Sequence, residues 1–545
     1  MSRHNLARHS KTQQYDFARV PRVALPRSKF RQPFRIPTTF DGNYLIPFYT
    51  DEVLPGDTFN VKMDSLIRML TPVTPVMDNI YVDVMFFFIP WRLVWTNFEG
   101  FISGNYTAAN VPVINFNGAS SGNNTVYDYL YGIPSTAIAA NYPISALYAR
   151  SDLLVYNTWF RDENLITETP VVMTDGPDAY TLYTLRKSGK RHDYFTSALP
   201  WPQKGTAVSL PLTGNAAVRG IGVSAAGTGG ASTNPVTQNV WQTGDALIGS
   251  FSGVGIEGAS GGINSQPERW LSIQMANNNA PNIYADMSTV SAATINALRQ
   301  AFQYQGILET DARGGTRFVE FLMAHFGVTA EDYRIQRPEY LGGDTARLNV
   351  APIAQTSATV GGSTPQGNLS AFVVGGHKHV GFVKSFVEHG CIIGYVRARA
   401  DMTYQNGLHR RFTRQSRYDF YLPSLAHLGE QVVRQDEIFF DGNATNGALA
   451  FGYQERWAEL RYHPSSISGN MRVSNPNSFS IWLLTLNYTV APALNQSFIE
   501  EQTPFTRIMA TNYAGAQFYG DFAFNNVVAR VMPVNSVPST LLTRM

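Results

Sequence analysis

The alternation of apolar and polar residues predicts β-strands towards both ends of the chain. From Ile80 to Phe88 every second residue is apolar while the positions between them are mixed, which is the two-residue period of a strand with one buried face. Pro90 is expected to end this strand because proline has no N–H to donate to a ladder. A second strand is predicted from Thr58 to Leu70. Further strands are predicted at Phe372–Val374, Val380–Val387, Ile392–Arg399, Gln431–Phe440 and Ile481–Tyr488.

A period of three to four residues predicts helices in the middle of the chain. Between residues 144 and 165, Leu147, Leu154 and Trp159 fall on one helical face. Two more helices are predicted, one from Ile295 to Leu308 and one from Phe318 to His325, with glycines on both sides of the second. Residues 100–145 are rich in Gly, Asn, Ser and Tyr and are predicted to form a long surface loop.

Residues 205–265 have a composition unlike the rest of the chain. They contain 14 glycines and only three charged residues, Arg219, Asp245 and Glu257. Such a segment cannot offset its ordering entropy with a core of its own, and it is too long for an ordinary connection within a compact domain. It is therefore either disordered or ordered by packing on copies of itself.

The distribution of these elements favours a mainly β fold. Strands at both ends, with long and partly helical material between them, fit a β-sandwich with large insertions better than three consecutive domains. Greek-key connections allow such strands to pair across hundreds of residues. We therefore predict an extended N-terminal arm at residues 1–40 and a β-sandwich at residues 41–545.

The charge of the chain is concentrated in this arm. The first 35 residues carry a net charge of +8, whereas the whole chain carries +2. An arm of this kind suits a polyanion such as nucleic acid, although a solvated tail is the alternative. The basic residues, which we predict to face DNA, are Arg3, Arg8, Lys11, Arg19, Arg22, Arg27, Lys29, Arg31 and Arg35.

The remaining composition indicates a protein whose surface is covered by other subunits. Charged residues make up only 15% of the chain and aromatic residues 12%, whereas soluble domains typically have about 25% charged residues. The single cysteine, Cys391, excludes a disulfide within the chain and a Cys-rich zinc site. No apolar stretch is long enough for a signal peptide or a membrane span, so we expect a soluble protein made in the cytoplasm.

No motif in the sequence predicts an enzyme, a cofactor or a metal site. His377 and His379 form an H-x-H pattern, but no clear third ligand accompanies them. The G-x-S-x-G pattern at residues 258–262 lacks the apolar strand that such a nucleophile turn requires. The basic run from Arg186 to His192 departs from the phosphate-loop pattern, and it could bind phosphate or a neighbouring subunit, or be solvated.

A second basic cluster combines arginine with aromatic residues. Arg410, Arg411 and Arg414 lie close to Tyr418 and Phe420 in the sequence. Arginine beside aromatic rings suits stacking on single-stranded bases, and it equally suits a subunit interface. We include these three arginines among the residues predicted to face DNA.

Five long segments of the chain resemble major capsid proteins of the Microviridae, in the gokushovirus branch. They are MDNIYVDVMFFFIPWRLVW (Met77–Trp95), GKRHDYFTSALPWPQKG (Gly189–Gly205), DARGGTRFVEFLMAHFGV (Asp311–Val328), RPEYLGG (Arg337–Gly343) and LHRRFTRQSRYDFYLPSLAHLGEQ (Leu408–Gln431). The segments lie in order across most of the chain, and the region at 205–286 matches poorly, as expected for a variable insertion of this family.

The resemblance implies an eight-stranded antiparallel jelly roll, the viral capsid β-sandwich, with a helical insertion at 291–345. It implies a T = 1 shell of sixty copies around a circular single-stranded DNA genome, in a virion assembled in the cytoplasm of a bacterial host. The variable insertion at 205–286 would form a threefold protrusion and contact the host. Three copies would there share the apolar residues Val240, Trp241, Leu247, Ile248 and Phe251.

The resemblance also implies the partners of the chain. These are identical copies at fivefold, threefold and twofold contacts, the single-stranded DNA genome, a small basic DNA-binding capsid protein, a DNA pilot protein and a receptor on the bacterial surface. Two alternatives remain open from the residues alone: a β-sandwich carbohydrate-binding protein, and a standalone single-stranded DNA-binding protein.

Overall fold

The computed structural model describes residues 26–105, 111–116, 124–133, 142–208, 295–359, 366–511 and 513–535, and the backbone of short strands between residues 217 and 286. The chain divides into two compact units, of which one comprises residues 203–310 and the other the rest of the chain. The β-sandwich belongs to the second of these units.

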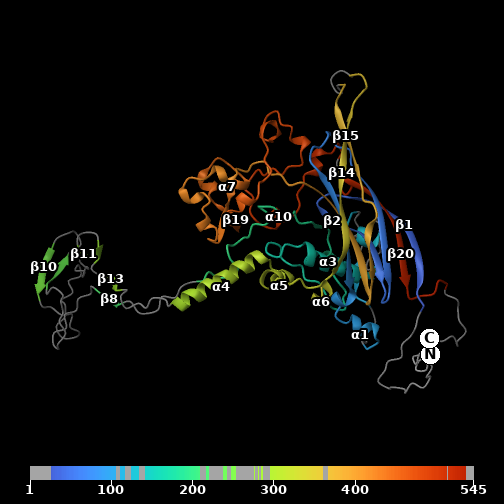
Figure 1. Cartoon of the computed structure of the whole chain (residues 1–545), viewed down its shortest axis with the longest axis horizontal. Helices are drawn as coiled ribbons and strands as arrows, with labels where there is room; N and C mark the ends of the chain where they lie inside the picture. The colour runs from blue at the N-terminus through green and yellow to red at the C-terminus, as the bar shows by residue number, and fades with distance from the viewer. Residues whose placement is uncertain are drawn as a thin grey trace, which may run out of the picture. The chain divides into compact units, whose positions relative to one another are not determined.

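Two antiparallel runs of strands form the sandwich (Figure 1). The first run, in pairing order, is β1 (Ser28–Phe40), β20 (Phe518–Arg530), β3 (Thr58–Met69) and β16 (Val380–Ser385). The second run is β14 (Glu339–Ala354), β4 (Ile80–Pro90), β17 (Gly390–Ala400) and β2 (Tyr44–Val53). The end of β14 pairs with β15 (Leu369–Gly375), which reaches β3 and joins the two runs, and β7 (Arg186–Lys187) extends the second run at β2.

Strands that are distant in the sequence pair with each other. β1 and β20 pair in unbroken register, from Ser28 opposite Arg530 to Phe40 opposite Phe518. Figure 1 shows these two strands, blue and red, side by side. The alternation of the two runs along the chain is the pairing order of a jelly roll, so the mainly β, antiparallel fold is confirmed. The predicted number of strands stays a prediction, because β14 and β15 extend beyond the two runs.

Aromatic rings fill the space between the two runs. The rings of Phe48 in β2 and Phe522 in β20 have centroids 4.2 Å apart, and those of Tyr49 and Phe524 are 4.7 Å apart. Phe86 of β4 lies against Phe382 of β16 at 5.7 Å. These pairs cross from one sheet to the other within one continuous apolar cluster, and burial of such rings dominates the energetics of a core.

A buried histidine also connects the two sheets. Nδ1 of His377 lies 2.8 Å from the hydroxyl oxygen of Ser65 in β3, and Nε2 donates to the carbonyl of Val82 in β4 (3.1 Å). In the neutral imidazole with its proton on Nε2, Nδ1 accepts from the Ser65 hydroxyl. Burial lowers the pKa of His377, while the hydrogen bond to Val82 and the charges of Asp344 and Asp83 act in the opposite direction.

The rest of the H-x-H pattern does not join His377 in a metal site. His379 is exposed, and its Nδ1 lies 3.4 Å from a carboxylate oxygen of Asp64. Within the described ranges, no group of three or more His, Cys, Asp or Glu side chains is placed to hold a metal ion. His379 is therefore exposed to solvent, whereas His377 is buried because the sheets close over it.

The second run of strands is covered on its outer face by a further layer. Phe87, Cys391 and Tyr395 point into a second apolar cluster. Helices α2 (Val126–Tyr131) and α3 (Leu147–Val155) supply much of the other side. Short elements of the same region are α1 (Phe98–Ile102), β5 (Val113–Phe116) and β6 (Tyr142–Ser145), and a π-helical turn continues α3 at Tyr156–Phe160.

The segment from 401 to 517 forms a further layer. Together with residues 165–199 it builds an apolar cluster that includes Phe195, Val433, Phe451 and Phe498, and its Leu484, Phe505 and Ile508 pack in the core of the sandwich. Its elements are β18 (Glu430–Arg434), α7 (Gln435–Ile438), α8 (Ala444–Gly447), β19 (Ala450–Glu455), α9 (Ala458–Arg461), α10 (Gln496–Ile499) and α11 (Phe505–Ile508). Isolated bridges connect it to the chain after β7, between Gly189 and Glu500 and between Leu199 and Tyr453.

The remaining elements lie between β7 and β14. They are β8 (Ala217–Arg219), β9 (Thr237–Trp241), β10 (Leu247–Ser252), β11 (Met275–Ala276), β12 (Ala280–Pro281), β13 (Tyr284–Asp286), α4 (Ile295–Gly314), α5 (Phe318–Phe326) and α6 (Asp332–Ile335). Helix α5 ends at Gly327, whose φ of 66° is readily adopted by glycine. No helix among the described residues is long and apolar enough to cross a membrane.

Several predicted elements are wrong in their extent or type. The strand predicted at Gln431–Phe440 stops at Arg434, where the side chain of Glu437 accepts the backbone N–H of Arg434 and starts α7. The strand predicted at Ile481–Tyr488 is a 3-10 turn followed by irregular chain. The loop predicted at 100–145 contains α2, whose Tyr127 is buried.

We predict that Phe524→Ala lowers the free energy of unfolding by about 3–5 kcal/mol, the usual cost of removing a buried phenylalanine ring. Phe524 stacks on Phe34 at 4.8 Å and on Tyr49 at 4.7 Å. Guanidinium chloride denaturation would measure the loss. Tyr519→Ala is the matched control, since Tyr519 lies on the exposed face of the same strand, and it should cost less than 1 kcal/mol. Equal losses in the two variants would contradict this account of the core.

We also predict that His377 makes stability fall on acidification. The pKa of His377 in the folded chain lies below its unfolded value of about 6.5. Its contribution to the free energy of unfolding is therefore complete above a pH of about 6.5. This contribution is lost as the pH falls, because the unfolded chain takes up the proton more readily than the folded one. The difference between the denaturation midpoints at pH 7 and pH 5.5 should therefore be smaller in His377→Gln than in the wild-type protein. The control His379→Gln, with an exposed side chain, should keep the wild-type difference, and an unchanged difference in His377→Gln would argue against the prediction.

Candidate nucleic-acid interface

Strand β1 carries a row of basic side chains on one face. Its residues alternate in burial, because successive side chains of a strand point to opposite sides. Phe30 and Phe34 point towards the sandwich, and Lys29, Arg31 and Arg35 are exposed on the other side. Four of the nine basic residues predicted in the arm, counting Arg27, are therefore described, and three share this face.

The register of the neighbouring strands extends this basic face. On the same side lie Lys62 and Arg68 of β3, both exposed, and Tyr519 of β20. The acidic side chains of this face are Asp64 and Asp521. We call the outward side of β1, β20 and β3 the open face. It presents five basic and two acidic side chains, and no layer comparable to that over the second run covers it among the described residues.

One of the five basic side chains is paired within the sheet. The Nε of Arg35 donates to Asp521 at 3.1 Å, and a second guanidinium nitrogen bonds the other carboxylate oxygen. The hydrogen bond and the charge of Asp521 raise the pKa of Arg35. Lys29 and Arg31 make no ion pair within the part of the chain that the structure describes, so they are the most available cations of β1.

The open face continues into the arm. Arg27, just before β1, reaches Thr58 at the start of β3, with 3.5 Å between Nη1 and Oγ1. The other predicted residues of the arm, Arg3, Arg8, Lys11, Arg19 and Arg22, lie outside the described residues. Among the described residues, the open face carries more basic than acidic side chains. Such a surface attracts phosphates without reading sequence.

The second basic cluster has a different environment. Arg410 donates to the carboxylate of Glu437 at 3.2 Å, and Arg414 donates to that of Glu459 at 3.4 Å. Both glutamates are buried, and burial raises the pKa of Glu437 while a hydrogen bond from the backbone of Arg434 lowers it. Arg411 is exposed and lies over the ring of Phe412. Two of the three arginines thus already compensate buried acids, which the sequence did not indicate.

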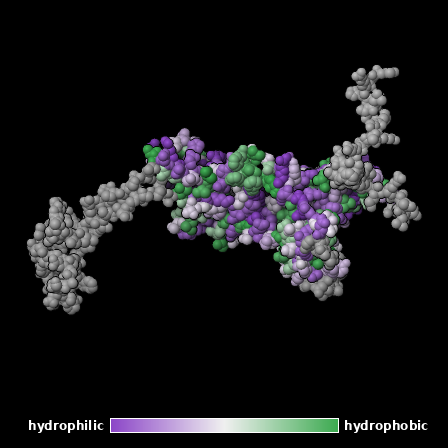
Figure 2. Space-filling model, turned by 90° about the horizontal axis from the view of Figure 1, so that it is seen from below, coloured by the Kyte–Doolittle hydropathy of each residue, from purple (hydrophilic) through white to green (hydrophobic). Residues whose placement is uncertain are grey.

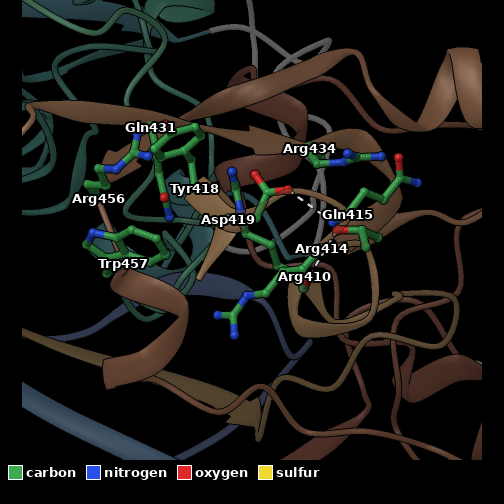
Figure 3. A pocket seen from close by; sticks show the side chains of 10 residues that line it. Arg410, Arg414, Gln415, Tyr418, Asp419, Gln431, Arg434, Arg456 and Trp457 are labelled. Atoms are coloured by element: carbon green, nitrogen blue, oxygen red, sulfur yellow. Dashed lines mark hydrogen bonds between the residues drawn. The ribbon is translucent and has the colours of Figure 1, made fainter. Parts of the chain in front are cut away.

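These arginines line a cavity of about 150 Å³ (Figure 3). It lies between the 3-10 turns at 410–419, strand β18 and the turn after β19. Its lining residues are Arg410, Thr413, Arg414, Gln415, Tyr418, Asp419, Gln431, Arg434, Arg456 and Trp457. We call it the arginine pocket. Whether Arg410, Arg411 and Arg414 face DNA stays a prediction.

The predicted contact residues of the variable insertion fall on two short paired strands. Trp241 of β9 is opposite Leu247 of β10, and Val240 is opposite Gly249, with an irregularity in register that includes Ile248. Phe251 is opposite Gln238. The structure describes the backbone of these strands, and their side chains lie outside the described part.

Comparisons with known proteins agree on one family. A family model described as "Capsid protein (F protein)" matches residues 18–540. The chain is 42% identical to capsid protein VP1 of Bdellovibrio phage phiMH2K over 555 residues, which cover 99% of this chain and 98% of the relative. It is 39% identical to capsid protein VP1 of Chlamydia phage 1, covering 96% and 97% of the two chains. It is 34% identical to capsid protein VP1 of Spiroplasma virus 4, with the same coverage.

We predict that alanine at both Lys29 and Arg31 weakens binding to a single-stranded oligodeoxynucleotide. Each lost phosphate contact should reduce the slope of log Kobs against log salt concentration by about 0.7, so the double variant should lose about 1.4. Fluorescence anisotropy at several salt concentrations measures the slope. The control Arg334→Ala removes an exposed arginine of α6 and should leave the slope unchanged, and equal slopes in all proteins would contradict a role of the open face.

Proposed function

The chain belongs to the family of phage capsid F proteins and is a major capsid protein of the Microviridae type, and from this premise we propose that sixty copies assemble into a closed T = 1 icosahedral shell around a circular single-stranded DNA genome. Its role is structural and its place is the virion. In the proposed shell the open face and the arm are turned inwards, towards the genome.

The observation that carries the orientation is the asymmetry of the sandwich. The outer face of the second run of strands is covered by the layer that contains α2 and α3. The outer face of the first run is uncovered among the described residues and is basic. A polyanion on the inside would meet this charge, and the attraction needs no sequence-specific contact.

Exposed apolar side chains support association between copies. Figure 2 shows apolar side chains (green) gathered between hydrophilic ones (purple) on the face seen from below. Many large apolar residues are exposed in the described chain, among them Phe318 and Phe326 of α5 and Phe412. Patches of this kind mark interaction surfaces, and a shell subunit would bury them against its neighbours.

The variable insertion at 205–286 is proposed as the threefold protrusion and host contact. Its many glycines and few charges suit a segment that is ordered by identical neighbours. The further partners in this proposal are a small basic DNA-binding capsid protein, a DNA pilot protein and a receptor on the bacterial surface. Binding of purified particles to host cell envelopes, with and without residues 210–265, would test the host contact.

We predict that deletion of residues 1–25 leaves shells intact but lowers their DNA content, since five of the nine basic residues of the arm are removed and β1 is kept whole. Electron microscopy shows the shells, and the ratio of absorbance at 260 and 280 nm reports DNA.

Deletion of residues 1–35 is the informative comparison. It removes Ser28–Arg35, which pair with β20, together with the ring of Phe34, so assembly should fail. Intact shells from the longer deletion would show that β1 is dispensable. Wild-type DNA content after the shorter deletion would show that these 25 residues do not bind the genome.

A further inference from the structure

One cation that lines the arginine pocket has no carboxylate partner among the described residues. Arg410, Arg414 and Arg434 each have a carboxylate partner, namely Glu437, Glu459 and Asp436. Arg456 makes no ion pair or hydrogen bond within the described residues, and its Nε is buried. Its guanidinium lies over the indole of Trp457, 5.0 Å from the ring centroid.

An acidic group also lines the pocket and limits what can enter. Asp419 accepts the backbone N–H groups of Ser416 and Gln415, at 2.7 and 3.0 Å. These hydrogen bonds lower the pKa of Asp419, so the group is an anion at neutral pH. Figure 3 shows Asp419 near Gln415, while Arg456 and Trp457 lie together on another side of the pocket. An incoming anion is therefore attracted to Arg456 and repelled by Asp419.

The rim of the pocket is aromatic and exposed. Phe412, Tyr418, Phe420 and Tyr421 all have large exposed fractions, with Phe412 at 66% and Tyr418 at 65%. From residue 411 to residue 429 no residue is buried. Arginine, tyrosine and tryptophan in and around a pocket are the residues that dominate protein–protein interfaces, so this segment needs a partner to cover it.

We propose that the arginine pocket receives a carboxylate side chain from a second copy of this chain. The three compensated arginines show which chemistry the pocket already uses, since guanidinium and carboxylate match in charge and shape. A cavity of about 150 Å³ is smaller than the roughly 300–1,000 Å³ of small-molecule sites, and it fits the end of a side chain. The incoming carboxylate would compensate Arg456, whose unpaired charge is costly at a covered surface.

The choice of partner rests on the proposed shell and on the place of the pocket. β1 and β7 lie at opposite ends of the strand order, and the chain after β7 bridges to the 401–517 layer at Gly189 and Leu199. Figure 1 shows this layer (orange) on the side of the sandwich away from β1 and β20. With the open face turned to the genome, the pocket lies away from the DNA, so the proposal assigns it to a neighbouring copy.

The test replaces Arg456 by Glu, which would repel an incoming carboxylate. Arg334→Glu is the control, because Arg334 is exposed and lies outside both the pocket and the segment that the partner would cover. We expect Arg456→Glu to reduce shell yield at least tenfold in sedimentation, while Arg334→Glu assembles like wild type. Arg456→Gln, which keeps a polar side chain and removes the charge, should give an intermediate yield. Thermal unfolding temperatures of the unassembled proteins should differ little, since Arg456 has no polar partner among the described residues of its own copy and the substitutions remove only its stacking on Trp457.

Each other outcome overturns the inference in a defined way. Equal shell yields for Arg456→Glu, Arg456→Gln and wild type would show that the pocket is not at a contact. Normal shells with reduced DNA would assign it to nucleic acid instead. If Arg456→Glu does not fold, a wild-type yield of Arg456→Gln overturns the proposal. If the wild-type chain forms small oligomers instead of shells, the proposed shell is wrong, but the pocket can still be tested, because Arg456→Gln should then abolish those oligomers. A strictly monomeric wild type would overturn both the proposed shell and the proposed pocket contact.

Discussion

The antiparallel pairing of β1 with β20 is the constraint on which the rest of the molecule depends. Arg35 donates a hydrogen bond to Asp521 across it, although 486 residues separate the two in sequence. Through this pair the first sheet gains both the aromatic rings that fill the core and the basic row that faces outwards. The alternation of side chains along a strand makes the two properties inseparable, because a slip of one residue would exchange the faces.

The two faces of the sandwich then acquire different roles. The second sheet carries apolar residues on both of its sides and is covered by the layer of α2 and α3, whereas the first sheet has an apolar side and a basic side. Among the described residues, the insertions between strands build the covering layers and leave the basic side open. Function in this fold therefore follows from where the long connections pack.

Sequence reasoning succeeded where local patterns were strong. The alternation at Ile80–Phe88 and the glycine after Phe326 gave β4 and α5 within a few residues. It predicted residues 1–40 as an extended arm and did not assign β1 to the sheet, although an edge strand tolerates prolines such as Pro33 and Pro37. The basic residues could be identified from composition, but only the register shows that Lys62 of β3 lies on the same face as Lys29. The pairing of Arg414 with Glu459, 45 residues away, left no local signal.

The distance between β1 and β20 along the chain also has a consequence for synthesis. Contacts that close such long loops form slowly, and a chain emerging from the ribosome holds β1 without its neighbour until β20 has been made. Unpaired strand edges are prone to aggregate, so a nascent subunit has to be protected for most of its translation. The same delay acts as a checkpoint, because a chain truncated before residue 518 cannot complete the first sheet and would be excluded from the particle.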